Sequence, residues 1–316
     1  MQSKYIPRFI TKTILPVFLA FALCGCTCSR SLSKIDDSDI DRYEITIPGI
    51  SRDYDLLFIT DTHIVISDES ADDEIQNYSE ERLALFTNDS GLVASELFTA
   101  WMEYADQTEP DALLLGGDII DSPSAANMEF LKSSLESLRV PYLYTLGNHD
   151  WTYPWDYMTE SGQEEYLPLL APYMESNTAI HTLELDDFII VAVDNSNNQI
   201  HPDALEEYRR ILSSKKPVIL LLHVPFYTES LLVKTSEVWA NGVVLGGGIH
   251  GGIYPNNTST EFLSLTTAAD SPVAAVFAGH VHLPDASSID GAKEIPQIVG
   301  DAGYKGRGTL IHISAE

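Results

Sequence analysis

Short polar motifs follow apolar, β-branched runs at several points in this chain, and this alternation constrains its fold more than any other feature. Leu56-Leu57-Phe58-Ile59 precedes Asp61-Thr62-His63, and the apolar residues 112–115 precede Gly116-Gly117-Asp118. The same relation holds for three further motifs, Gly147-Asn148-His149-Asp150, His223 and Gly279-His280-Val281-His282. Because open α/β sheets place their sites where strands end, these polar side chains are expected to converge on one patch.

Apolar residues with helical spacing separate the predicted strands. This spacing predicts helices near residues 92–105, 125–138 and 203–212, and further strands at residues 142–146, 188–193, 218–222 and 273–277. Residues 295–299 and 309–313 are predicted to form a closing hairpin or paired edge strands. The alternation of strands and helices favours the α/β class. A chain of 316 residues that is 44% hydrophobic can bury the core of one large domain.

The balance of charges restricts the possible partners. The chain has 18 basic and 47 acidic residues, which gives a formal net charge of −29. Such a charge opposes binding to duplex nucleic acid, so no partner of this kind is expected. Residues 67–81, which follow Asp61-Thr62-His63, are especially acidic. They could exclude polyanions or favour a substrate with a cationic group. Alternatively, they form a solvent-exposed surface that has no effect on the choice of substrate.

The first residues indicate export and lipid attachment rather than a folded domain. Lys4, Arg8 and Lys12 precede an uncharged apolar stretch, residues 14–23, which is shorter than the roughly 20 residues that span a bilayer. Leu23-Cys24-Gly25-Cys26 resembles the lipobox of bacterial lipoproteins, and Gly25 makes Cys26 the expected site of lipidation. An ordinary secretory signal, cleaved nearby without lipid, is the alternative.

Three segments follow from this pattern: a lipoprotein signal peptide at residues 1–25, an acidic, serine-rich tether at residues 26–50 and a folded domain at residues 51–316. The protein is then expected in a bacterial cell envelope, on the extracytoplasmic side, anchored by lipid in the outer or the cytoplasmic membrane. Its cysteines are Cys24, Cys26 and Cys28, so the domain is expected to contain neither a disulfide nor a cysteine nucleophile.

Taken together and in this order, the motifs resemble the calcineurin-like metallophosphoesterase family. The family pattern is Asp-x-His, Gly-Asp, Gly-Asn-His-Asp/Glu, a lone His and then Gly-His-x-His, and the resemblance extends from about Asp53 to the C-terminus. It implies a four-layer α/β/β/α sandwich, in which two mixed β-sheets are flanked by helices and two metals lie at the strand ends.

The resemblance also implies a set of metal ligands. Asp61, His63 and His282 would hold the first metal, Asn148, His223 and His280 would hold the second, and Asp118 would bridge both. A carboxylate suits the bridging position because its charge offsets the repulsion between two close cations. The mixed oxygen and nitrogen donors suit divalent Mn, Fe, Zn or Co. Two such ions can share a water and lower its pKa, so the expected nucleophile is a bridging hydroxide.

Two further residues are implied to assist catalysis. His149 would protonate the leaving oxygen as general acid and, with Asn148, would contact the substrate. Asp121 would orient His149, although it could instead cap a turn before Pro123. Ser122 stands where phosphoprotein phosphatases have an arginine, and Asp121 stands where purple acid phosphatases have a tyrosine. These departures argue against both of those branches.

The predicted function is metal-dependent hydrolysis of a small phosphomonoester or phosphodiester by a monomer. A nucleotide-type pyrophosphatase on the same fold and a non-catalytic surface-binding lipoprotein are the alternatives. Residues 224–272 are expected to form a mobile loop over the site, in which His250 could contact substrate. His181, His201 and His312 match no motif and are expected to be structural.

Overall fold

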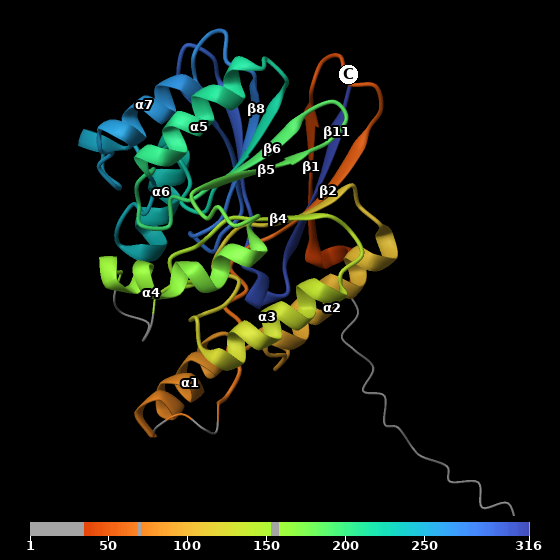
Figure 1. The fold of residues 1–316 in the computed structure, drawn as a ribbon, viewed down its shortest axis with the longest axis vertical. Helices are drawn as coiled ribbons and strands as arrows, with labels where there is room; N and C mark the ends of the chain where they lie inside the picture. Colours follow the sequence, from red (N-terminus) through yellow and green to blue (C-terminus); the bar gives the residue numbers. More distant parts are fainter. Residues whose placement is uncertain (1–34, 69–70, 72, 153–157, 316) are drawn as a thin grey trace, which may run out of the picture. The chain divides into compact units, whose positions relative to one another are not determined.

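A computed structural model of the chain describes residues 35–68, 71, 73–152 and 158–315 (Figure 1). The chain divides between residues 32 and 33, and every described residue belongs to the part that follows. The expected signal peptide and Cys26 therefore lie outside the described residues. Within the described ranges, no helix is both long enough and apolar enough to cross a membrane.

The first of two mixed sheets has the strand order β1-β11-β2-β3-β4. Its strands are β1 (Ile40–Thr46), β11 (Gly308–Ser314), β2 (Tyr54–Ile59), β3 (Ala112–Leu115) and β4 (Tyr142–Tyr144). Strands β2, β3 and β4 are parallel, whereas β11 runs antiparallel to β2. The carboxyl ends of β2, β3 and β4 therefore meet at one edge of the sheet.

The second sheet has the strand order β5-β6-β7-β8-β10-β9. Its strands are β5 (Ile180–Glu184), β6 (Ile189–Val193), β7 (Val218–Leu221), β8 (Val273–Ala278), β10 (Ile295–Val299) and β9 (Asp285–Ile289). The four central strands run parallel, and β5 and β9 pair with them in the antiparallel sense. The carboxyl ends of β7 and β8 are thus at the same edge of this sheet.

Side chains that alternate along the strands build the layers. Leu56 and Phe58 of β2 pack between the sheets in one core with Phe277 of β8, whereas Leu57 and Ile59 face the opposite side and pack against helices. The helices are α1 (Asp73–Leu85), α2 (Ala94–Thr108), α3 (Ala125–Ser137), α4 (Glu160–Leu170), α5 (Pro202–Ser213), α6 (Glu229–Trp239) and α7 (Asn257–Thr266). Short 3-10 turns occupy Asp37–Asp39, Ala171–Tyr173, Gly248–His250 and Gly303–Lys305.

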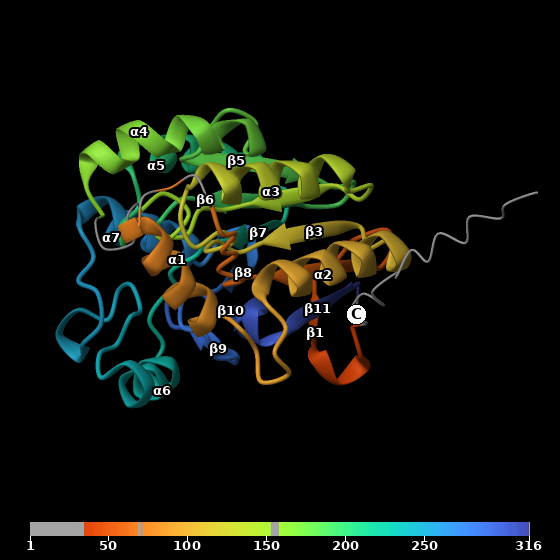
Figure 2. The same ribbon diagram turned by 90° about the horizontal axis from the view of Figure 1, so that it is seen from below.

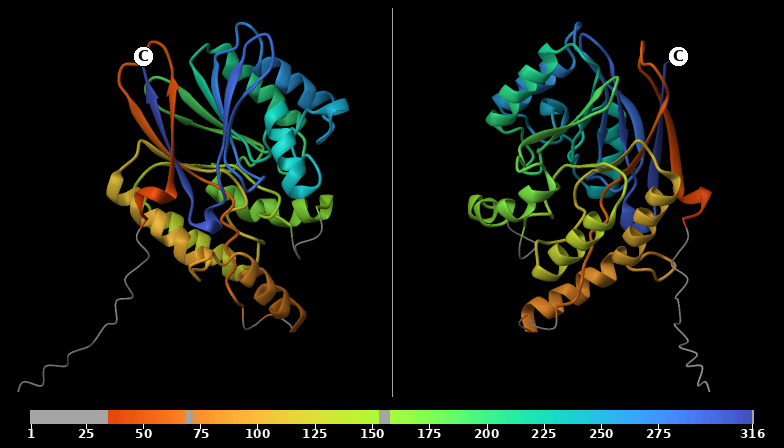
Figure 3. Two further views of the ribbon diagram at one scale, coloured as in Figure 1. Left: turned by 180° about the vertical axis from the view of Figure 1, so that it is seen from behind. Right: turned by 45° about the vertical axis from the view of Figure 1, so that its right-hand side comes forward.

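Helices α2 and α3 cover the outer face of the first sheet, while α5 and α7 cover that of the second (Figure 2). The strands of the two sheets lie as neighbouring layers in the left view of Figure 3. This arrangement confirms the predicted α/β/β/α sandwich. The predicted helices and strands also appear, with bounds that differ by a few residues, although β1, β5 and β9 were not anticipated.

The predicted pairing of residues 295–299 with residues 309–313 is wrong. Strand β10 lies between β8 and β9 in the second sheet, and β11 lies between β1 and β2 in the first. Both strands bury apolar side chains, among them Ile298 and Ile311. An apolar run of this length fits any inner strand equally well, so it carries no information about its partner.

Two predicted boundaries also change. The tether cannot extend to residue 50, because β1 pairs along its whole length with β11 and Ile45, Ile47 and Ile50 are buried. The segment at residues 224–272 is not one mobile loop, because it contains α6 and α7. The exposed sides of β1 and α7 are polar, whereas Val233, Val238 and Trp239 are exposed on α6, so none of the three elements shows a simple apolar pattern in the sequence.

Candidate metal centre

Side chains from both sheets meet where the parallel strands end. Strand β2 leads to Asp61 and His63, β3 to Asp118, and β4 to Asn148 and His149. From the second sheet, β7 leads to His223, and β8 leads to His280 and His282. The structure thus brings together the residues predicted to bind metal, with only Cys26 of the predicted site residues outside the described part of the chain.

Two clusters of potential metal ligands share Asp118. One contains Asp61, His63, Asp118 and His282, the other contains Asp118, His223 and His280, and in each the ligand atoms lie within 4.8 Å of one another. The same Asp118 oxygen, Oδ2, is 3.7 Å from His63 Nε2 and 3.2 Å from His223 Nε2. One carboxylate therefore faces both clusters, which matches the division into two metal sites that the sequence predicts.

The backbone at the strand ends adopts an unusual conformation. Asp61, His63, Asp118, His280 and His282 have φ angles of 52°, 48°, 51°, 73° and 55°. Side-chain-bearing residues rarely occupy this left-handed region, and such strain persists mainly where the surrounding fold enforces it and a function requires it. Five of the eleven side-chain-bearing residues with a positive φ in the described ranges lie in this patch, which supports a functional role for it.

Two glycines allow the strand ends to approach so closely. A Cβ atom at Gly147 would lie 2.2 Å from the backbone nitrogen of Asp118, and one at Gly279 would lie 1.9 Å from Thr60 Oγ1 and 2.5 Å from Asp61 Oδ2. A side chain at Gly147 would displace Asp118, and a side chain at Gly279 would displace Asp61. The Gly in each motif is therefore needed to position the neighbouring motif.

Hydrogen bonds orient two of the imidazoles. His223 Nδ1 donates to the carbonyl oxygen of Gly116 at 2.8 Å, and His63 Nδ1 donates to Asp121 Oδ1 at 3.0 Å. Because both acceptors lack a proton, Nδ1 carries a hydrogen in each ring, so Nε2 is the nitrogen that faces the cluster. Such bonds are the usual means of fixing a metal-binding histidine.

The patch combines negative charge with imidazoles that differ in their affinity for a proton. Burial alone would raise the pKa of Asp118, but His223 and His149 outweigh it and hold the pKa well below its usual value. Burial lowers the pKa of His63 to about 4 and that of His280 to about 3. Burial would lower the pKa of His223, but the nearby Asp118 carboxylate outweighs burial and raises this pKa to about 10. A cation that binds His223 would therefore displace a proton.

An unsatisfied amide oxygen tests whether these residues fit a metal. Asn148 Oδ1 is buried and has no hydrogen-bond partner among the described residues. A buried amide oxygen in this state costs about 1–3 kcal/mol unless a ligand satisfies it. A divalent cation would do so, and the carboxylate, amide and imidazole donors form a set that first-row divalent metals accept.

Asp121 forms a third group of potential ligands with His63 and His149, and the ligand atoms of this group also lie within 4.8 Å of one another. The Asp121 oxygens accept two hydrogen bonds from Arg82 of α1, each 2.7 Å long, and Oδ1 lies 3.2 Å from His149 Nδ1. Burial would raise the pKa of Asp121, but Arg82, His149 and His63 together keep it far below its usual value. The carboxylate is thus ionised and held between two imidazoles. No sequence motif indicated Arg82, because α1 reaches the site only through the tertiary fold.

Asp150 joins two of the strand-end loops. Its carboxylate is fully buried and accepts hydrogen bonds from the backbone N–H groups of Gly147, Asp118, Ile119 and Ile120, at 2.7–3.1 Å. Asn195, after β6, plays a similar part for the loop after β7, because its Oδ1 accepts from the N–H groups of His223 and Val224. Neither role can be predicted from the sequence, although Asp150 belongs to the motif Gly147-Asn148-His149-Asp150.

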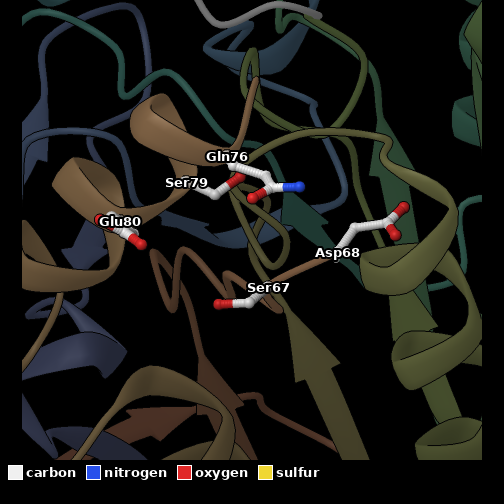
Figure 4. A pocket seen from close by; sticks show the side chains of 5 residues that line it. All are labelled: Ser67, Asp68, Gln76, Ser79 and Glu80. Carbon is white, nitrogen blue, oxygen red and sulfur yellow. The ribbon is translucent and has the colours of Figure 1, made fainter. Parts of the chain in front are cut away.

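Residues of the acidic segment, 67–81, line a cavity of their own. Ser67, Asp68, Gln76, Ser79 and Glu80 line a space of about 530 Å³, and Figure 4 shows Asp68 and Glu80 on opposite sides of it. None of these five residues belongs to the ligand clusters found in the described ranges. An effect of this segment on the choice of substrate stays a prediction.

The remaining histidines lie outside the clusters. His250 is exposed and stacks on Tyr227 with 5.9 Å between ring centroids. His181 is buried on β5, His201 accepts a hydrogen bond at the start of α5, and His312 pairs with Asp55. These positions agree with structural roles for His181, His201 and His312.

The chain is similar to one known protein family and to several solved structures. A family model described as calcineurin-like phosphoesterase matches residues 54–284. A dimetal phosphatase from Danio rerio is similar in structure, with 11% identity, a TM-score of 0.49 and coverage of 80% of this chain and 88% of that chain. Phosphopantetheinyl hydrolase from Mycobacterium tuberculosis (10% identity, TM-score 0.40, coverage 81% and 92%) and NAD nucleotidase from Haemophilus influenzae (13%, 0.41, 80% and 46%) are also similar. No curated protein matches the chain.

We predict that Asp150→Asn destabilises the fold and lowers its capacity for metal. The amide would place an N–H₂ group against backbone donors, and each buried donor left unpaired costs about 1–3 kcal/mol. Thermal unfolding and the metal content after dialysis against Mn²⁺ measure the two effects. Asp89→Asn, at an exposed position, is the matched control. A variant as stable and as metal-rich as the wild type would contradict the role given to Asp150.

Proposed function

Because the chain belongs to the calcineurin-like phosphoesterase family, we propose that it hydrolyses a small phosphomonoester or phosphodiester at the shared clusters. The protein is a phosphoester hydrolase, and its family together with the residue clusters indicates a binuclear site for divalent metals. The observation that carries the proposal is the position of Asp118, whose Oδ2 faces the imidazoles of His63 and His223.

Residues of both sheets would hold the metals. Asp61, His63 and His282 would bind one ion, Asn148, His223 and His280 would bind the other, and Asp118 would contact both. When bound, two divalent ions would lower the pKa of an attacking water and stabilise the negative charge that develops on the phosphoryl oxygens. Mn, Fe, Zn and Co all suit this donor set.

His149 is placed to act on the leaving group. Its backbone N–H donates to Asp118 Oδ1 at 2.8 Å, and its side chain lines a cavity together with Asn148 and Asp118. Burial would lower the pKa of His149, but Asp118 and Asp121 raise it above its ordinary value. A raised pKa favours the protonated imidazole, which is the form that a general acid requires. Asp121, fixed by Arg82, would orient the ring through Nδ1.

Loss of the shared carboxylate should abolish turnover. We predict that Asp118→Asn removes activity toward p-nitrophenyl phosphate, its bis-ester and a nucleotide panel, because the neutral amide no longer offsets the repulsion between two cations. Activity of the metal-titrated protein from residue 27 onward measures the effect, and the panel also distinguishes ester hydrolysis from cleavage of a pyrophosphate bond. Equal activity in the wild type and the variant, or none in either with every metal, would contradict catalysis at this site.

The acid role of His149 should depend on the leaving group. We predict that His149→Ala lowers kcat on an alkyl phosphate by about 100-fold to 10,000-fold, and lowers it less on p-nitrophenyl phosphate, whose leaving group needs no proton. His312→Ala, on β11 and outside the ligand clusters, is the control. Full activity of His149→Ala on the alkyl phosphate would sink the assignment.

The location in the envelope is a further part of the proposal. It rests on the resemblance of residues 23–26 to a lipobox, with Cys26 as the lipidated residue. Growth with a palmitate analogue should label the full chain, and Cys26→Ser should abolish the label while Cys28→Ser keeps it. An unlabelled wild-type protein would favour an ordinary secretory signal.

A further inference from the structure

An apolar wall borders the candidate metal centre on one side. The cavity at the clusters has a volume of about 150 Å³, and its polar side is formed by Asp118, Asn148, His149 and two of the cluster histidines. Its remaining lining residues are Trp239, the last residue of α6, and Val243. Both come from the segment at residues 224–272, which none of the ligand motifs includes.

The position of Trp239 is fixed against the loop that carries two of the proposed ligands. Its indole Nε1 donates to the carbonyl oxygen of Val281 at 2.9 Å, and its ring meets that of His282 edge-on, with 5.3 Å between centroids and an angle of 80°. Ala240 ends α6 in a left-handed conformation, with a φ of 54°. The indole is therefore held at a defined place beside His282.

The indole is only partly covered in spite of this anchoring. Trp239 is 43% exposed, whereas Leu231, Val244 and Val281 form a buried cluster against which Val243 packs. An exposed aromatic ring beside a site indicates a binding surface, because a second ring that packs against it contributes beyond the burial of its area. The single indole donor is already used, so the wall offers dispersion and stacking rather than hydrogen bonds.

We propose that Trp239 and Val243 form a subsite for a planar aromatic group in the organic part of the substrate. The inference rests on the proposed function, because the phosphoryl group would occupy the polar side of the cavity. The cavity is smaller than the roughly 300–1,000 Å³ that encloses a whole organic ligand. It therefore has room for the phosphoryl group, and the attached ring lies against the exposed indole. Aryl phosphates are preferred over short aliphatic phosphates for this reason.

Phenyl phosphate and ethyl phosphate test the subsite, because they differ in the organic group alone. In the metal-loaded full chain, Trp239→Ala should raise KM for phenyl phosphate by about tenfold, the upper end of what an aromatic contact contributes. KM for ethyl phosphate and inhibition by inorganic phosphate should change much less, because neither ligand has a ring that contacts the indole. Trp239→Phe should keep most of the preference, because it retains a ring. Val233→Ala, at an exposed position of the same helix, is the control.

Calorimetric binding of phenylphosphonate and methylphosphonate provides a readout that needs no turnover. The wild type should bind phenylphosphonate more tightly, and Trp239→Ala should lose that difference. If the wild type hydrolyses neither ester, the proposed function fails, and the two phosphonates alone decide the subsite. Equal affinity of the wild type for both phosphonates overturns the inference. The inference is also overturned if Trp239→Ala loses the same affinity for aryl and alkyl ligands and is inhibited more weakly by phosphate.

Discussion

A buried carboxylate that faces imidazoles from two different sheets is the constraint on which the rest of this structure depends. Asp118 follows β3 of the first sheet, His223 follows β7 of the second, and Asp118 Oδ2 lies 3.2 Å from His223 Nε2. Burying so much charge is costly unless each group has a partner of opposite sign. Divalent cations between these groups would provide that compensation, and the unsatisfied oxygen of Asn148 indicates the same need.

The fold supplies this arrangement through its parallel strands and through buried polar side chains that connect their loops. Parallel strands bring their carboxyl ends to one edge, and the packing of two sheets brings two such edges together. Asp150 and Asn195 then hold the loops by accepting backbone hydrogen bonds. The left-handed conformation of Asp118 can persist because Asp150 accepts hydrogen bonds from its N–H group and from those of the next two residues. Because Gly147 and Gly279 have no side chains, their loops can lie directly against Asp118 and Asp61.

Features that depend only on a short run of residues, such as a strand and the polar motif after it, could be predicted from the sequence. The motifs after β2, β3, β4, β7 and β8 could be recognised because each follows an apolar run, and the family they resemble is confirmed by the family match. Strand partners were not predictable in the same way, because an apolar run such as β10 or β11 fits several inner positions. Arg82 and Trp239 lie far from every motif in the sequence, and only the packing of α1 and α6 brings them to the site. Strand β1 was missed because its exposed side is polar, so that it resembled the acidic tether before it.

The central claim is that two cations bind around one shared carboxylate. Equilibrium dialysis against Mn²⁺, followed by elemental analysis of the protein, measures this most directly. The account predicts two equivalents per chain for the wild type and the loss of one tightly bound equivalent in each of the variants His282→Ala and His280→Ala, which affect different clusters. Saturation of the wild type at one equivalent or fewer, or unchanged binding in both variants, would contradict it.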